Sequence, residues 1–178
     1  LVQACAIVSR RLPDLEFWIV GPVDEDPEYF RECHDIAESL GVSNLIFTGP
    51  QDVTEIYPVI DLLVLTSVSE GQPLTLLECA CAGIPAVATD VGACRELLEG
   101  GSDEDRALGP SGLITAVGSP TQTAEAMLRI LEDRDLWLQL SRSGRQRIEK
   151  FYQQTRVIES YRALYNKHLR AGQNVGVG

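Results

Sequence analysis

Two glutamates with seven residues between them, Glu70 and Glu78, flank the segment of this sequence that carries the clearest chemistry. Gly71, Gln72 and Pro73 come after Glu70, and a helix is expected to begin at Pro73 because proline suits the first helical turn. The free backbone amides of a helix start can bind a phosphate group. Glu78 lies roughly 7.5 Å further along the helix axis, at 1.5 Å per residue. A carboxylate there can accept hydrogen bonds from both hydroxyls of a ribose, so the segment predicts a nucleotide site.

Each glutamate also has an ordinary structural interpretation. Glu70 taken alone is typical of a solvated loop, and Glu78 could pair with a basic side chain or lie at a solvated edge of the helix. We expect Leu74 and Cys81, which flank Glu78 on the helix, to be packed. An unpaired carboxylate between them would cost several kcal/mol, so Glu78 should have hydrogen-bond donors nearby. The pair at this spacing is more specific than either glutamate alone.

The rest of the chain alternates short apolar runs with helical segments. The expected strands span residues 15–20, 45–48, 62–66, 86–89 and 113–115, and the expected helices span residues 27–40, 54–59, 73–82, 94–99 and, in two or three pieces, 121–169. Apolar strands that alternate with helices are typical of a parallel sheet covered on both faces. We therefore predict an α/β fold with a doubly wound, Rossmann-like parallel sheet and a helical C-terminal extension. Ligands of such sheets bind beyond the carboxyl ends of the strands.

Length and charge exclude several classes of function. A chain of 178 residues predicts one domain, over residues 1–170, and a small, flexible, glycine-rich tail at residues 171–178. The formal net charge of −11 argues against nucleic acid and anionic membranes as partners, because binding to either requires a basic face. No apolar run reaches the roughly 18 residues of a transmembrane helix.

Metal sites and disulfides are not expected. The five cysteines lack C-x-x-C spacing, which predicts small, buried, reduced side chains in a cytoplasmic protein. Two D-x-D patterns, at residues 24–26 and 103–105, resemble metal-binding motifs, but solvated loops are the expected structure of both. His34 and His168 are expected on helix surfaces.

The first element is expected to be an amphipathic helix, because Leu1, Cys5, Val8 and Leu12 recur at helical spacing. A helix in a β–α alternation should follow a strand, so we expect a first strand, and an N-terminal partner domain, upstream of Leu1. An apolar stripe on the late helices is expected either to pack in the core or to dock onto that partner domain. The stripe consists of Trp137, Leu138, Leu140, Ile148, Phe151, Val157, Tyr161 and Tyr165.

Residues 67–100, which read SVSEGQPLTLLECACAGIPAVATDVGACRELLEG, resemble the retaining glycosyltransferases of the two-domain GT-B architecture, in family four. The resemblance is strongest to the branch that builds the Pel exopolysaccharide, and it extends to residues 18–33, 47–67 and 151–165. It implies that this chain is the C-terminal half of such an enzyme and binds a nucleotide-sugar donor, commonly a UDP-sugar. No cofactor or divalent metal is implied. The implied partners are a glycan acceptor, held by the N-terminal domain, and other proteins of polysaccharide synthesis.

The same resemblance assigns roles to residues of this sequence. Glu70, the implied catalytic residue, would contact hydroxyls of the donor sugar, and Glu78 would hold the ribose. The backbone near Gln51 would face the base, Gly49 would line the same cleft, and Gly92 would approach it. The amides around the diphosphate would be those of Gly71, Gln72, Leu74 and Thr75.

Two departures from the family pattern matter. Many relatives have E-G-F-G where this chain has Glu70-Gly71-Gln72-Pro73, and Pro73 has no N–H to offer a phosphate. The Arg and Lys that neutralise the leaving diphosphate in the family lie just upstream of the helix that opens this chain. We therefore expect weak diphosphate binding and no turnover by this chain alone.

Two functions from other classes stay open. One is a stand-alone nucleotide-sugar binding or regulatory module without catalysis, and the other is a small α/β signalling domain with an acidic pocket. The sequence contains no G-x-G-x-x-G motif of a dinucleotide-binding dehydrogenase and no G-x-S-x-G motif of a hydrolase.

Overall fold

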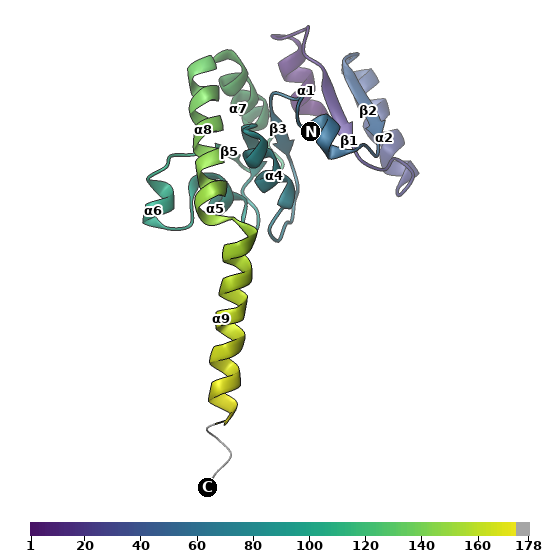
Figure 1. The fold of residues 1–178 in the computed structure, drawn as a ribbon. Coiled ribbons are helices and arrows are strands. Elements are labelled where there is room, and N and C mark those ends of the chain that lie inside the picture. Colours follow the sequence, from purple (N-terminus) through teal and green to yellow (C-terminus); the bar gives the residue numbers. More distant parts are fainter. Residues whose placement is uncertain (174–178) are drawn as a thin grey trace.

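The computed structural model describes residues 1–173, which form an α/β fold of parallel strands and surrounding helices (Figure 1). The strands are β1 (Phe17–Val20), β2 (Leu45–Gly49), β3 (Leu63–Leu65), β4 (Ala86–Thr89) and β5 (Gly112–Thr115). The helices are α1 (Val2–Ser9), α2 (Pro27–Ser39), α3 (Val53–Ile56), α4 (Leu74–Ala82), α5 (Cys94–Glu99), α6 (Asp103–Arg106), α7 (Pro120–Glu132), α8 (Arg134–Phe151) and α9 (Gln154–Gln173). The α/β class and each predicted strand are confirmed, with boundaries that move by at most two residues.

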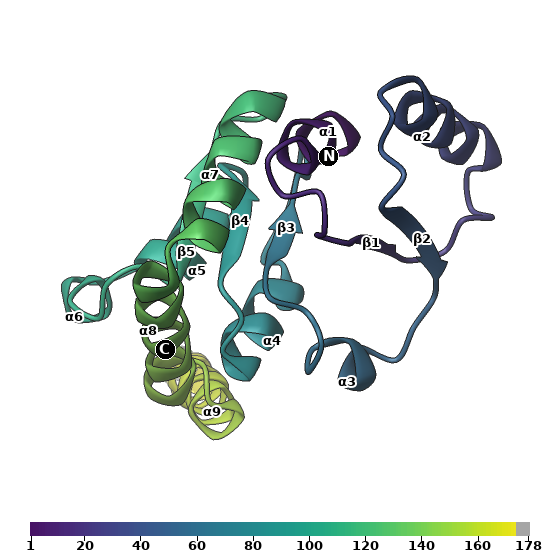
Figure 2. The ribbon, with the colours of Figure 1, turned by 90° about the horizontal axis from the view of Figure 1, so that it is seen from above.

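The strands form two parallel sheets instead of the single sheet that the sequence predicts. β1 pairs with β2, and β3, β4 and β5 pair in that order. Figure 2 shows the two sheets next to each other, with β1 and β3 as their facing edges and α1 near both. Because hydrophobic periodicity predicts strands but not which strands pair, the sequence did not reveal this division.

The three-stranded sheet is covered on both faces, as its apolar strands predict. Val64, Val87 and Leu113 belong to a core with α1 and α7. The alternate side chains, among them Ala86 and Ala88, belong to a second core with α4 and α5. All four residues of β4 are buried, so this central strand is the best protected in the described chain.

Helix boundaries follow the local signals of the sequence. Asp26 caps α2 by accepting a hydrogen bond from the amide of Tyr29 at 3.0 Å, and Pro27 comes next. Gly83 ends α4 in the left-handed region, at φ 80°, where glycine has no Cβ to clash. Phe30 of α2 packs against Phe47 of β2. The two rings meet edge to face, with 5.0 Å between their centroids.

The segment at residues 103–105 was expected to be a solvated loop, and this prediction is wrong for its backbone and for Asp105, whereas Asp103 and Glu104 are exposed as expected. It forms α6, and Asp105 is buried in an ion pair with Arg147 of α8, with 2.6 Å between Oδ1 and Nε. The partner of Asp105 lies 42 residues away in the sequence. No local signal therefore distinguishes this buried carboxylate from the exposed ones next to it.

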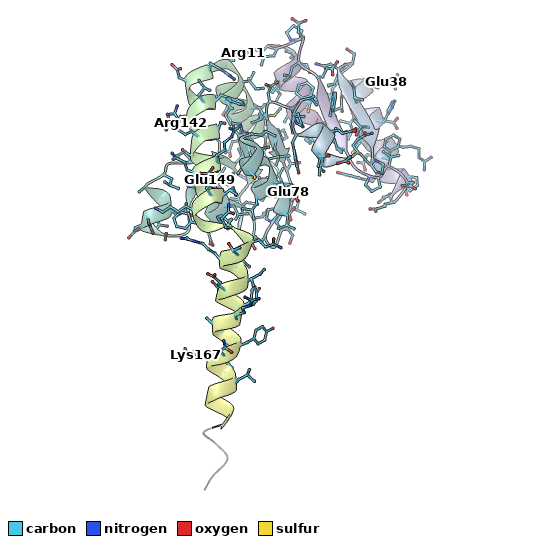
Figure 3. All side chains as sticks on the ribbon, in the orientation of Figure 1. Arg11, Glu38, Glu78, Arg142, Glu149 and Lys167 are labelled. Carbon is cyan, nitrogen blue, oxygen red and sulfur yellow. The ribbon has the colours of Figure 1, made fainter. Side chains whose placement is uncertain are left out.

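The apolar stripe of the late helices divides at the start of α9. On α8, Leu140 and Ile148 are buried and Trp137 donates a hydrogen bond to the carbonyl of Asp61 at 2.7 Å. On α9, which extends away from the body of the molecule, Val157 and Tyr161 are exposed (Figure 3). Core packing is therefore confirmed for Leu140 and Ile148 of α8, whereas Leu138 on the same helix and the α9 part of the stripe are exposed. The first three residues of the expected tail belong to α9, and residues 174–178 lie outside the described part.

Cysteine burial is mixed. Cys5, Cys79 and Cys94 are buried as expected, Cys33 is half-buried, and Cys81 is exposed, contrary to the expectation. Burial and the nearby charge of Glu78 raise the pKa of Cys79 to about 12, so its thiol stays protonated at neutral pH. No helix within residues 1–173 is long and apolar enough to cross a membrane.

Candidate functional site

The loop that carries Glu70 is held in place by the end of the neighbouring strand. The hydroxyl of Thr89, the last residue of β4, donates to the carbonyl of Ser67 at 2.6 Å. The hydroxyl of Ser67 donates in turn to Oε1 of Glu70 at 2.6 Å. Glu70 is half-buried. Its carboxylate is therefore oriented by a short chain of hydrogen bonds, and its remaining acceptor positions are available to a ligand. The sequence analysis assigned no role to Ser67, because nothing local in the sequence indicates that it orients Glu70.

Gly92 lies directly against the Glu70 loop. It has φ +51°, and a Cβ at this position would be 2.1 Å from the carbonyl oxygen of Glu70. The amide of Ala93 donates to the carbonyl of Gly71 at 2.9 Å. The structure thus brings together Glu70, Gly71 and Gly92, and only glycine fits the last position, since any side chain would displace the loop.

The start of α4 has no side chain that caps its amides. Pro73, predicted as the first helical residue, is instead the N-cap, and α4 begins one position later at Leu74. The longer helices α2, α7 and α8 differ, because Asp26, Ser119 and Asp133 cap them. Gln72, Leu74 and Thr75 are exposed around the helix start. Unsatisfied first-turn amides on an exposed helix start can bind an anion.

Glu78 lies on an exposed face of α4 (Figure 3). Leu74 is 63% exposed and Cys81 is exposed, so the prediction that both pack around Glu78 is wrong. The α4 residues that pack instead are Leu76, Cys79 and Ala80, which face the sheet and α8. Oε2 of Glu78 accepts a hydrogen bond from the hydroxyl of Tyr57 at 2.5 Å.

Neither Glu70 nor Glu78 forms an ion pair within the described part of the chain. The nearby cation on α5, Arg95, is already bound to Asp90 and Glu99. Hydrogen bonds from Arg95 hold the pKa of the Asp90 carboxyl below its usual value. The two carboxylates of the candidate site therefore keep acceptor capacity that the described residues do not use.

Gly49 is the last residue of β2, and Gln51 lies in the segment between β2 and α3, the helix that precedes Tyr57. The carbonyl of Gly49, a residue with φ +69°, accepts a hydrogen bond from the amide of Gly21 at 3.1 Å. The Gln51 side chain donates to the carbonyl of Thr48 at 2.9 Å and is exposed. The first of these hydrogen bonds joins the segment after β1 to the end of β2. Within residues 1–173 no hydrogen bond connects them to Glu70 or Glu78.

Two cavities of the molecule lie away from these residues. One, of about 570 Å³, is on the outer face of α2 around Glu32, and the other, of about 530 Å³, is between the α1–β1 connection and Trp137. Neither is lined by Glu70, which is half-buried, or by Glu78, which is exposed. An exposed cluster of His34, Asp35 and Glu38 on α2 has the spacing of metal ligands but shares no residue with the candidate site.

Comparison with known proteins assigns residues 1–133 to a family described as glycosyl transferases group 1. N-acetyl-alpha-D-glucosaminyl L-malate synthase of Bacillus anthracis is 27% identical over 98% of this chain and 43% of its own length. The lipopolysaccharide core biosynthesis mannosyltransferase LpsB of Rhizobium meliloti is 31% identical over 76% of this chain and 37% of its own length. The chain thus spans less than half of these relatives.

Solved structures show the same fold. The C-terminal domain of a glycosyl transferase group 1 protein, LpcC of Francisella tularensis, has a TM-score of 0.72 and 23% identity over 86% of this chain and 77% of its own. Anabaena HepE in complex with UDP has a TM-score of 0.75 and 20% identity over 92% of this chain and 44% of its own. The Rossmann-like arrangement of parallel strands and helices therefore matches the C-terminal domain of GT-B enzymes.

Proposed function

Because this chain belongs to the glycosyl transferase group 1 family, we propose that it is the donor-binding half of a retaining glycosyltransferase of family four. The proposed donor is a hexosyl nucleotide, UDP-linked as in the complexes of Anabaena HepE with UDP and UDP-glucose. The proposed acceptor is a glycan, held by a second domain, in cytoplasmic exopolysaccharide synthesis of the Pel type. In the reaction the bond between the anomeric carbon and the diphosphate breaks, the nucleoside diphosphate leaves with the electron pair, and the acceptor hydroxyl replaces it and loses its proton.

The observation that supports this proposal best is the uncapped start of α4 between two carboxylates that form no ion pair with any described residue. The diphosphate would bind the amides at this start, those of Gly71, Gln72, Leu74 and Thr75. Glu78, one and a half turns further along α4, would accept hydrogen bonds from the ribose. Glu70 would contact the hydroxyls of the donor sugar, which binds beyond the diphosphate.

The base would lie near Gly49 and Gln51, on the loop that leads into α3. Gly92 would support the site from below the Glu70 loop. No metal ion has a role in this proposal, because backbone amides and the helix start provide the favourable charge for the phosphates.

The first test is titration of this chain with UDP, read by ligand-observed NMR, which detects affinities into the millimolar range. Glu78→Ala should weaken UDP binding at least ten-fold, since two hydrogen bonds to a charged group are lost. Its midpoint of chemical denaturation should not change, because Glu78 is exposed. Glu38→Ala removes an equally exposed carboxylate from α2 and should leave UDP binding unchanged.

Other results would decide against parts of the proposal. UDP affinity that survives Glu78→Ala would rule out the ribose role, and no UDP binding by the wild-type chain would remove the nucleotide site altogether. Submicromolar binding would favour a stand-alone binding module. We also propose that the chain alone transfers no sugar from UDP-glucose, since none of the ion pairs within the described residues brings a cation to Glu70, where it could neutralise a leaving diphosphate. A glycoside product in that assay would contradict this.

A further inference from the structure

Tyr57 has no role in the site as the sequence predicts it, yet the structure places its hydroxyl on the carboxylate proposed to hold the ribose. The two residues are 21 positions apart and come from different elements, since Tyr57 follows α3 and Glu78 lies on α4. The hydroxyl hydrogen of Tyr57 is donated to Oε2 of Glu78 at 2.5 Å. A hydrogen bond to an ionised acceptor is stronger than one between neutral groups.

Hydrogen bonds and packing of α3 hold Tyr57, its C-cap residue, in place. Asp52 caps α3 by accepting a hydrogen bond from the amide of Thr54 at 2.9 Å, and Ile56 is buried. The amide of Tyr57 donates to the carbonyl of Val53 at 3.0 Å. The ring is half-buried, and burial together with the contact to Glu78 raises the pKa of Tyr57 above its usual value. The hydroxyl therefore stays protonated, and remains a donor, throughout the physiological pH range.

Glu78 needs such a contact because its own helix does not restrain it. An exposed glutamate on a helix samples several rotamers, and fixing one of them on ligand binding costs free energy. A hydrogen bond at Oε2 favours one rotamer of Glu78 before the ligand binds. The lone pairs of Oε1 then remain free to accept hydrogen bonds from a ligand. The preorganised carboxylate then binds a diol with a smaller entropic penalty.

We propose that Tyr57 is a positioning residue that fixes the Glu78 carboxylate in the orientation that receives the two ribose hydroxyls. This inference rests on the proposed function, in which Glu78 binds the ribose. The loop before α3 carries Gln51, so Tyr57 also connects the loop proposed to face the base with the helix that holds the ribose.

The test compares two probes, UDP and 2′,3′-dideoxy-UDP, on this chain and its Tyr57→Phe variant. Phenylalanine keeps the ring and its packing but removes the hydroxyl. We expect Tyr57→Phe to weaken UDP binding by about three- to ten-fold, the effect of losing one hydrogen bond. Binding of 2′,3′-dideoxy-UDP, which has no diol, should stay the same. Tyr29→Phe removes an exposed hydroxyl from α2 and should change neither affinity.

A second comparison separates positioning from structure. In a Glu78→Gln background, Tyr57→Phe should have a much smaller effect on UDP binding, because the two residues act through one contact. Equal weakening of both probes by Tyr57→Phe would mean that the tyrosine acts on the fold, and would overturn the inference.

Failure of the inference and failure of the proposed function give different results. If the wild-type chain prefers UDP over the dideoxy analogue but Tyr57→Phe leaves this preference intact, only the positioning role is wrong. If the wild-type chain binds both probes equally, or neither, the ribose role of Glu78 is wrong and Tyr57 has nothing to position.

Discussion

Two groups of charged residues in this molecule differ in how far their hydrogen-bonding capacity is used within the protein. Arg147 is completely buried and donates five hydrogen bonds, which is every N–H of its guanidinium group. The acceptors come from α6 and from the segments around α5 and β5, and they are the carboxylate and carbonyl of Asp105, the carbonyls of Leu98 and Gly109, and the hydroxyl of Ser111. Glu70 and Glu78, by contrast, each accept one hydrogen bond from a hydroxyl and pair with no cation among residues whose side chains the structure describes.

The difference separates charge used for structure from charge kept for binding. A buried ion must satisfy all its hydrogen-bonding capacity inside the protein, because unpaired it would be very costly. Surface carboxylates have no such requirement, so acceptor positions that remain unused there are available to a ligand. The contrast therefore predicts that mutations in the first group change stability and mutations in the second change binding.

The largest expected effect is that of Arg147→Ala. Removal of the guanidinium leaves Asp105 buried without its partner, and we expect a loss of roughly 3–5 kcal/mol in the free energy of unfolding. Chemical denaturation measures it. Arg142→Ala, on the exposed side of the same helix (Figure 3), is the control and should change stability little. A small change in the free energy of unfolding on Arg147→Ala would show that this buried hydrogen-bond network does not stabilise the fold.

Gly92→Ala should have an intermediate effect on stability and a clear effect on binding. The added Cβ would be 2.1 Å from the Glu70 carbonyl, so the loop must move. Positive φ alone costs an alanine roughly 1–2 kcal/mol. Gly118→Ala measures that cost separately, because Gly118 has φ +70° and nothing within 4 Å of a Cβ. We expect Gly92→Ala to destabilise more than Gly118→Ala and to weaken UDP binding, which Gly118→Ala should not. If both variants changed stability and UDP binding equally, the contact between Gly92 and the Glu70 carbonyl would have no role.

The smallest expected effect is that of Arg95→Ala, which removes an exposed pair of ion pairs to Asp90 and Glu99. At neutral pH the denaturation midpoint should change hardly at all, because solvent screens exposed pairs. The pKa of Asp90 is lowered in the folded state, so its stabilisation is present above the ordinary pKa of aspartate and is lost as the pH falls through the lowered value. Unfolding of the variant should therefore depend less on pH below about pH 4. An unchanged acid profile would show that Arg95 does not stabilise the Asp90 carboxylate.

Local signals in the sequence were sufficient for most elements. Proline, aspartate and glycine at helix ends predicted α2 and the end of α4, and apolar runs predicted each strand of the described chain. The spacing of Glu70 and Glu78 around a helix start likewise pointed to one segment, because the loop, the amides and both carboxylates are contiguous in the chain. The predicted roles of these residues remain predictions.

Long-range partners were decided only by the tertiary structure. Asp105 is buried by its pairing with Arg147 in a segment expected to be exposed, and the contact of Tyr57 with Glu78 joins residues 21 positions apart. The exposure of Leu74 and Cys81 and the division of the strands into two sheets were likewise decided only by the tertiary structure. The sequence by itself thus determined what depends on neighbouring residues: the helix ends, the strands and the candidate loop. Which groups meet across the fold was decided by packing, because burial and hydrogen bonding between distant segments depend on where the whole chain places them.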